Sequence, residues 1–382
     1  MRYSYIKKIN RCYDNLLSYA ITHYLSKNEL GEIIRIANLE LHKRPSELVW
    51  EKKWEKLGKP NVKYYRVFSQ YIGENDDIVP DNICHNVVEH ILNPDQMRGA
   101  CEDKNLFDLY LSKEFNEEVT PNTILRCIDG SFYDKRYKRI DLNDQFLSSI
   151  KVDKLIIKPS VGSSSGNGIT FYDKKMDGVF VLHNSNKELT TSYIKDVLPQ
   201  NFVAQECMTQ SDFMAQFCAT SINTIRIATY RSVITNEPDV LNCIMRIGNN
   251  GAMVDNAHAG GCFIGVSREG RLGNYLCNQY GEKFSVFNGI NFNKHEFVIP
   301  DFQEIIAFAK RVASCVPHMR LLQLDIAIDN KGLPKLIEYN VSAFAPWLYQ
   351  FTIGPAFSKY TDEIIDYCFN NKDLATRIVV SF

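Results

Sequence analysis

The sequence has no excess of charge of either sign. Its 382 residues include 44 lysines and arginines against 45 aspartates and glutamates, so the formal net charge is −1. This balance provides no global field that would attract nucleic acid or an anionic membrane surface. The sequence also lacks any run of about 18 apolar residues, and Met1 to Lys8 contain no apolar core of a signal peptide. We therefore expect no nucleic-acid partner, no membrane insertion and a cytoplasmic location.

Paired cysteine motifs are also missing. The chain has 11 cysteines, none of them in a C-x-x-C pair, and they lie in apolar segments such as Phe217-Cys218. This pattern favours reduced, buried thiols over disulfides or zinc ligands. With 45% hydrophobic residues the chain can bury a large core, and its length predicts two or three lobes.

The order of patterns along the chain predicts an α/β fold of the α+β type. Residues 1–95 combine aromatic residues with helical apolar spacing, for example at Leu16, Leu17, Ala20 and Ile21. We interpret this region as a helical lobe that packs against the rest of the protein. The alternative interpretation is a cap that recognises the acceptor substrate. A small α/β linker subdomain is expected at 96–150. Beyond it we predict strands at 225–230, 242–247 and 321–328 and helices at 106–115, 300–315 and 358–369.

A lysine followed by a glycine-rich loop is the first candidate for ligand binding. An apolar run ends at Lys158, and a loop of glycine and serine follows at 161–168. Glycine lets the backbone turn its N–H groups toward an anion, and the lysine adds a positive charge. The loop is neither a Walker A motif nor G-x-G-x-x-G before a helix. The alternative is a solvated hairpin loop that returns as a strand at 169–172.

Three polar residues on apolar strands form the second candidate. Asp325 lies in an apolar run, and Glu338 and Asn340 are two residues apart, which places them on one face of a strand. Burying such groups is costly unless a ligand neutralises them. Hard oxygen donors of this kind suit Mg²⁺. The alternative is the polar outer face of a hairpin that turns at 329–332.

Two arginines and a polar loop complete the set of candidates. Arg226 and Arg246 each lie inside apolar strand segments, and the guanidinium fork suits phosphate or carboxylate. The alternative role for each arginine is a structural salt bridge. The tight segment 254–261 is typical of a loop that fits a ligand, and His258 within it is a candidate for proton transfer.

Taken in order, these features resemble the ATP-grasp fold. The segments 221–226, 254–256 with Gly260-Gly261, and 323–325 are most similar to the sugar-transfer-associated ATP-grasp family. The resemblance covers about residues 95–345, and the helical N-terminal third is similar as well. It implies two α/β lobes that grip ATP: a lobe with the glycine loop at 151–210 and a catalytic lobe at 211–345. A C-terminal helix in 346–382 follows them.

The resemblance also implies ATP and Mg²⁺ as ligands and a role for each position. Lys104 and Lys158 match the two nucleotide-binding lysines, and Gln205 and Glu206 match the hinge that contacts adenine. The other implied nucleotide-binding positions are Gly162, Ser163, Ser164, Ser165, Gly168, Met208 and Asp212. The implied catalytic residues are Arg226, Arg246 and Lys158. The implied Mg²⁺ ligands are Asp325, Glu338 and Asn340, and the substrate candidates are Asp255, Asn256 and His258.

The activity implied by this resemblance is that of an ATP-dependent carboxylate–amine ligase. A carboxylate would attack the γ-phosphate to give an acyl phosphate and ADP, and an amine would displace phosphate, while a mobile loop at 162–168 closes the site. An amino acid and a sugar are the expected small-molecule substrates, in cell-surface polysaccharide assembly. A homodimer or an association with a glycosyltransferase is also allowed. The alternatives are a small-molecule kinase and a non-catalytic nucleotide-binding partner of a glycosyltransferase.

Overall fold

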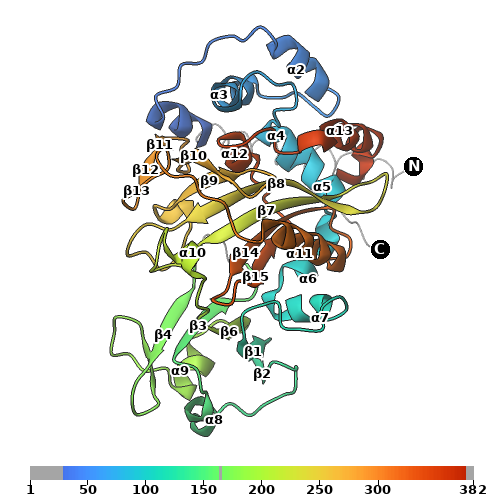
Figure 1. Ribbon diagram of the computed structural model, residues 1–382. Coiled ribbons are helices and arrows are strands. Elements are labelled where there is room, and N and C mark those ends of the chain that lie inside the picture. The colour runs from blue at the N-terminus through green and yellow to red at the C-terminus, as the bar shows by residue number, and fades with distance from the viewer. Residues whose placement is uncertain (1–28, 163–165, 376–382) are drawn as a thin grey trace, which may run out of the picture.

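The computed structural model describes residues 29–162 and 166–375. Figure 1 shows N-terminal helices above a large sheet and a smaller sheet with its own helices below it. The helical spacing expected at Leu16 to Ile21, the candidates Ser163, Ser164 and Ser165, and residues 376–382 lie outside the described residues.

The smaller lobe is built on an antiparallel sheet in the order β2-β1-β6-β3-β4-β5. Helices α8 (Asp144–Ser149) and α9 (Thr191–Asp196) close its core, which includes Leu125, Ile157 and Phe202. The strands of this sheet are β1 (Thr123–Ile128), β2 (Ser131–Tyr133), β3 (Lys154–Pro159), β4 (Thr170–Lys174), β5 (Phe180–Leu182) and β6 (Phe202–Glu206).

The larger lobe is built on a second antiparallel sheet in the order β11-β10-β9-β8-β7-β14-β15. Its strands are β7 (Thr224–Arg231), β8 (Pro238–Ile247), β9 (Cys262–Val266), β10 (Leu272–Cys277), β11 (Lys283–Phe284), β14 (Leu321–Ile328) and β15 (Pro334–Asn340). The short elements beside it are α10 (Asp212–Ala215), the 3₁₀ turn η3 (Ala257–Ala259) and the hairpin β12 (Val286–Phe287) and β13 (Ile290–Asn291).

The two faces of the large sheet are covered by different helices. Helix α11 (Phe302–Cys315) packs on one face, where its Ile305 shares a core with Leu324 and Ile326 of β14 and Ile227 of β7. Side chains alternate along a strand, so Asp325 lies on the opposite face. That second face carries the N-terminal helices and the C-terminal helices in a separate core.

The N-terminal region is helical throughout most of its described length. Residues 29–36 are helical, and the indoles of the fully buried Trp50 and Trp54 donate to the carbonyls of Ile78 and Asp76 at 2.6 and 3.1 Å. The helices on this side are α2 (Glu47–Trp54), α3 (Val62–Ile72), α4 (Asp81–Ile83), the π-helical η1 (Cys84–Val88), α5 (Glu89–Leu92), α12 (Pro346–Gln350), η4 (Ser358–Tyr360), α13 (Thr361–Asn370) and η5 (Lys372–Ala375). Helix α6 (Asp95–Glu102) instead buries Cys101 in the core on the α11 face.

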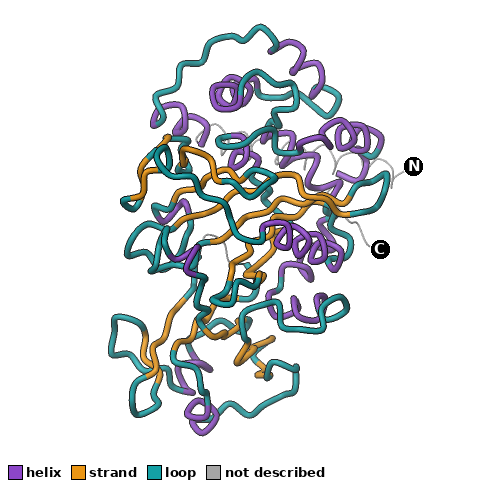
Figure 2. The backbone as a smooth tube through the Cα atoms, in the orientation of Figure 1, coloured by secondary structure: helices purple, strands orange, loops and turns teal. Residues whose placement is uncertain are grey.

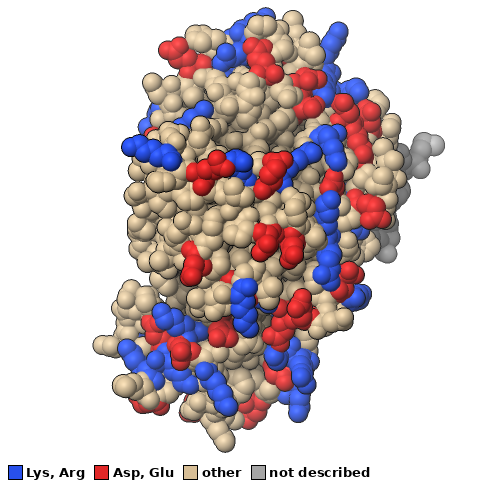
Figure 3. All heavy atoms as spheres, viewed as in Figure 1, with Lys and Arg blue, Asp and Glu red and all other residues tan. Residues whose placement is uncertain are grey.

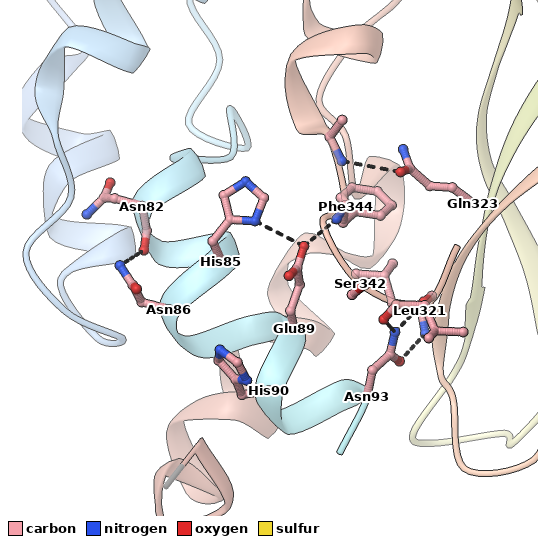
Figure 4. A network of polar contacts seen from close by, with 12 residues as sticks. Asn82, His85, Asn86, Glu89, His90, Asn93, Leu321, Gln323, Ser342 and Phe344 are labelled. Carbon is pink, nitrogen blue, oxygen red and sulfur yellow. Dashed lines mark hydrogen bonds and ion pairs between the residues drawn. The ribbon is translucent and has the colours of Figure 1, made fainter. Parts of the chain in front are cut away.

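Buried polar contacts attach the N-terminal helices to the strands of the large sheet (Figure 4). The amide of Asn93 donates to the carbonyls of Leu321 and Val341 at 2.6 and 2.7 Å and accepts from the N–H groups of Arg320 and Leu321 at 2.9 Å. The carboxylate of Glu89 accepts from the N–H of Phe344. The segment that follows β15 is therefore held by α5 and its C-terminal end.

The observed architecture confirms the mixed α/β fold with a helical N-terminal region. The helix predicted at 106–115 is shorter, because 3₁₀ turn η2 (Lys104–Leu106) precedes α7 (Phe107–Leu111) and Phe115 turns inward against Phe308. Every described cysteine is free. Within the described chain, no helix combines the length and the apolar character needed to cross a membrane.

The charged side chains are mixed over the surface. Outside the two sheets and the β12–β13 hairpin, the described chain consists of helices and loops (Figure 2). Acidic and basic groups alternate on the face drawn in Figure 3 and form no large patch of one sign. This distribution agrees with the near-neutral net charge of −1.

The Asn93 contacts predict a large loss of stability on truncation. Asn93→Ala should lower the free energy of unfolding by about 3 kcal/mol, because buried backbone groups on β14 lose their partners. Gln303→Ala is the matched control, since the Gln303 amide also donates to a backbone carbonyl, that of Arg268, but is exposed. The control should cost about 0.5 kcal/mol or less. Urea unfolding of both variants is the measurement, and equal losses would contradict the anchoring role of Asn93.

Candidate active site

A buried carboxylate on β14, the strand next to the edge strand β15 of the large sheet, is held by two arginines. Asp325 on β14 lies opposite Arg226 on β7 in the strand register. The Nε and Nη2 atoms of Arg226 donate to the two oxygens of Asp325 at 2.7 and 2.6 Å, and Arg246 Nη1 donates to Oδ2 at 3.1 Å. Burial alone would raise the pKa of Asp325, but the two guanidinium groups outweigh it and lower that pKa to about 2. The carboxylate is therefore ionised at neutral pH.

A second buried carboxylate holds the other side of Arg246. Asp255 Oδ1 lies 3.0 Å from Arg246 Nη2, and Oδ2 accepts from the backbone N–H of Thr224 at 3.1 Å and from the Thr224 hydroxyl. Burial raises the pKa of Asp255, and Arg246 opposes that rise. Asp255, Arg246, Asp325 and Arg226 form a continuous row of alternating charges, which we call the charge row.

Glu338 connects the charge row to the smaller lobe. It lies opposite Asp325 in the pairing of β14 with β15, and its Oε2 atom is 3.3 Å from Lys104 Nζ. The backbone N–H of Lys104 donates to the carbonyl of Ser160 at 2.9 Å, directly after β3. Lys104 thus contacts the large-lobe strand β15 through its side chain and the end of the small-lobe strand β3 through its backbone. The Asn340 amide donates to the Gln323 carbonyl at 3.4 Å.

Lys158 is a buried cation at the end of β3. It is 6% exposed, and its ammonium forms no hydrogen bond or ion pair among the described residues. Burial lowers its pKa to about 8, Glu338 opposes the shift and Lys104 adds to it. Lys158, Lys104 and Glu338 therefore interact electrostatically across the junction of the two lobes.

The predicted hinge residues lie on β6, beside the strand that carries Lys158. Gln205 pairs with Ile156 in the register, and its Nε2 atom donates to Pro121 O and Thr123 Oγ1 at 3.2 Å. Its buried Oε1 has no partner among the described residues. Glu206 accepts from the Asn122 amide at 2.9 Å. Met208 is half-buried, and Asp212 is exposed at the start of α10.

The substrate candidates after Asp255 lie on a surface loop. The Asn256 side chain accepts from the N–H of His258 at 3.0 Å, which starts η3, and His258 is exposed. No hydrogen bond or ion pair joins these two residues to the charge row in the described part of the chain. Gly162 and Gly168 have positive φ angles of 63° and 76°, and a side chain at Gly168 would clash with Pro159 at 2.8 Å.

The oxygen chemistry of the donor set suits the expected Mg²⁺, but both Asp325 oxygens already accept from guanidinium groups. Asp325, Glu338 and Asn340 offer hard oxygens from neighbouring positions of two paired strands. Among the described residues, no group of three or more His, Cys, Asp and Glu side chains is arranged to hold a metal ion. A metal held here would use the Asn340 amide oxygen and would take its remaining ligands from bound phosphates and water.

Three supporting residues were not found from the sequence. Thr224 anchors Asp255, Gln323 donates to the Tyr349 hydroxyl at 3.0 Å, and the fully buried Ser160 hydroxyl has no partner among the described residues. Thr224 is the first residue of β7, and a threonine is common in strands, so its residue type gave no sign that it anchors Asp255. Of the three residues, Ser160 is the one with a signal in the sequence, because it directly follows Lys158 and Pro159 at the start of the glycine-rich loop.

Two antiparallel sheets, with Lys104 and Glu338 in contact between the two lobes, agree with the predicted ATP-grasp fold. A family model described as sugar-transfer-associated ATP-grasp matches residues 88–364. The chain belongs to the sugar-transfer-associated ATP-grasp family. No curated protein matches it.

Solved ATP-grasp structures resemble the chain at low identity. The D-alanine–D-alanine ligase from Bacillus anthracis is 16% identical with a TM-score of 0.37, over 72% of this chain and 69% of that one. The VanG D-Ala:D-Ser ligase from Enterococcus faecalis is 11% identical with a TM-score of 0.40, over 71% and 61%. The L-amino acid ligase from Bacillus licheniformis is 11% identical with a TM-score of 0.29, over 63% and 40%. The chain spans 51%, 63% and 50% of the length of three further matched structures.

The buried ammonium of Lys158 predicts a pH-dependent stability. The unfolded lysine keeps its proton up to a pKa of about 10.4, whereas the folded one loses it near a pKa of about 8. The unfolded state therefore binds more protons between these values, and the free energy of unfolding rises with pH there. The contribution of the neutral Lys158 side chain to the free energy of unfolding is complete above pH ~10.4 and is lost as the pH falls through 8.

Lys158→Met should remove this pH dependence and should stabilise the ligand-free protein by about 1–3 kcal/mol at pH 7. Urea unfolding of the wild type and the variant between pH 7 and 10 measures the difference. Lys195→Met, on the exposed part of α9, is the control and should change stability by about 0.5 kcal/mol or less. A destabilised Lys158→Met variant at pH 7 would show that the ammonium has a favourable partner.

Proposed function

We propose that the protein is an ATP-dependent carboxylate–amine ligase that works through an acyl phosphate. The observation that carries this proposal is the charge row beside Glu338 and two lysines at the junction of the lobes. Four cationic side chains converge there on a patch that also offers oxygen donors for a metal. A triphosphate needs both kinds of group.

Each side chain has a defined task in this mechanism. Lys158 and Lys104 would bind phosphate oxygens, and the unpartnered Oε1 of Gln205 would accept from the adenine amino group. Arg226 and Arg246 would stabilise charge on the γ-phosphoryl group as it transfers to the carboxylate. Asp325, Glu338 and Asn340 would hold Mg²⁺, which neutralises phosphate charge when bound. Positioning and electrostatic stabilisation would supply most of the catalysis.

The proposed substrates are a uronic acid or amino sugar and an amino acid, joined in the assembly of a cell-surface polysaccharide. The sugar-transfer association of the family supports the sugar substrate. Asn256 and the exposed His258 lie on the loop next to Asp255 and are proposed to contact the acceptor. Glycine positions 162 and 168 are proposed to lie over the phosphates.

Removal of the Glu338 carboxylate should abolish turnover and preserve the fold. Glu338→Gln keeps the shape of a side chain that is 30% exposed, but it removes a charge that a metal needs. The rate of ADP release, with pooled amino acids, uronic acids and amino sugars, should fall about 100-fold or more. Glu282→Gln, a half-buried glutamate that bonds Asn278 in the large lobe, should retain turnover. Full activity of Glu338→Gln would remove Glu338 from the site.

An acyl phosphate should be trapped by hydroxylamine. With ATP and the carboxylate substrate but no amine, the proposed enzyme should form a hydroxamate in amounts equal to the ADP released. A kinase would release ADP and give a phosphate ester, but no hydroxamate. Omission of ATP is the control. ADP formation without hydroxamate would replace the ligase assignment with hydroxyl phosphorylation.

A further inference from the structure

The two arginines of the charge row are held in different ways. Arg226 makes a bidentate contact with Asp325, with N···O distances of 2.7 and 2.6 Å. Arg246 reaches Asp325 through a single hydrogen bond of 3.1 Å. A single contact fixes a guanidinium plane less well than a fork does. The orientation of Arg246 therefore depends on its second partner, the carboxylate of Asp255, at 3.0 Å.

Asp255 is itself fixed on the neighbouring strand. Its Oδ2 atom accepts from the backbone N–H of Thr224, at 3.1 Å, and from the hydroxyl of the same residue. Thr224 lies directly opposite Arg246 in the pairing of β7 with β8. Asp255 is 8% exposed. Most of its lone pairs are thus directed into the protein, which leaves little of the carboxylate for an acceptor.

The loop that carries Asp255 depends on glycines for its path. A Cβ atom at Gly261 would lie 2.7 Å from the carbonyl oxygen of Asp255 and 2.9 Å from that of Ile247. A Cβ atom at Gly248 would lie 3.2 Å from the carbonyl oxygen of Val254 and would clash with the side chain of Ser221. These contacts leave no room for a side chain at either position. The backbone is therefore packed closely at the point where Asp255 enters the site.

We propose that Asp255 is a positioning residue, which fixes the guanidinium of Arg246 against the transferred phosphoryl group through its anchor on Thr224. The inference rests on the proposed function, because it requires turnover of ATP at this site. Asp255 balances the charge of one arginine in the ligand-free protein. Its loss leaves two guanidinium groups with one carboxylate, so phosphate binding is retained while the orientation of Arg246 is lost.

The test separates ATP binding from turnover. Asp255→Asn keeps the size of the side chain and one acceptor for Thr224. It should lower kcat for ADP release about 10- to 100-fold and leave the Kd for ATP, measured by calorimetry, within about threefold of the wild type.

Thr224→Val keeps the backbone N–H but removes the hydroxyl, and its kcat should fall about 3- to 10-fold. Asp329→Asn is the matched control, because Asp329 is also 8% exposed but, among the residues that the structure describes, its carboxylate accepts only from backbone N–H groups of its own turn. Its kcat should equal that of the wild type.

A double-mutant cycle with Arg246→Lys distinguishes positioning from general support of the fold. If Asp255 acts through Arg246, the double variant should have a kcat close to that of Arg246→Lys alone, because the residues act as a unit. Additive losses, or a loss of ATP affinity as large as the loss of kcat, would overturn the assignment of Asp255. A wild-type protein that binds no ATP would instead overturn the proposed function, and the inference would fall with it.

Discussion

One buried carboxylate shared by two guanidinium groups is the interaction on which the site depends. Asp325 is 2% exposed on β14 of the large sheet, and an isolated charge is costly to bury there. Arg226 and Arg246 remove that cost and lower the pKa of Asp325 to about 2. Breaking such a group by removing one partner is typically destabilising by about 3–5 kcal/mol. The sheet therefore keeps these charges together before any ligand binds.

The remaining geometry follows from where those strands end. Asp325 and Arg226 lie on the face of the sheet that also carries the N-terminal helices, and the ends of β14 and β15 approach the smaller lobe (Figure 1). Lys104 contacts both lobes, through Glu338 on one side and Ser160 on the other. Lys104 thus links Glu338 to the end of β3. The N-terminal helices hold the segment after β15 from the opposite direction, through Glu89 and Asn93.

The sequence predicted the strands and the polar positions better than it predicted the contacts. Alternation along β14 and β15 placed Asp325, Glu338 and Asn340 on strands, because polar residues within apolar runs stand out. The pairing of Asp325 with Arg226 depends on the register between strands that are distant in sequence, and no local pattern encodes it. The Thr224 anchor of Asp255 was missed for the same reason. Helix α7 is shorter than predicted: a 3₁₀ turn precedes it, it ends at Leu111, and Phe115 beyond its end packs against Phe308.

The most direct test of the account is the fate of an oxygen atom of the carboxylate substrate. That substrate would be prepared with a heavy oxygen isotope in its carboxyl group and incubated with the protein, ATP, Mg²⁺ and the amine, and the released phosphate would be analysed by mass spectrometry. Attack of the carboxylate on the γ-phosphate followed by displacement with the amine predicts one heavy oxygen atom in each phosphate released. Phosphate that carries no heavy oxygen, although the amide forms, would contradict the acyl phosphate mechanism.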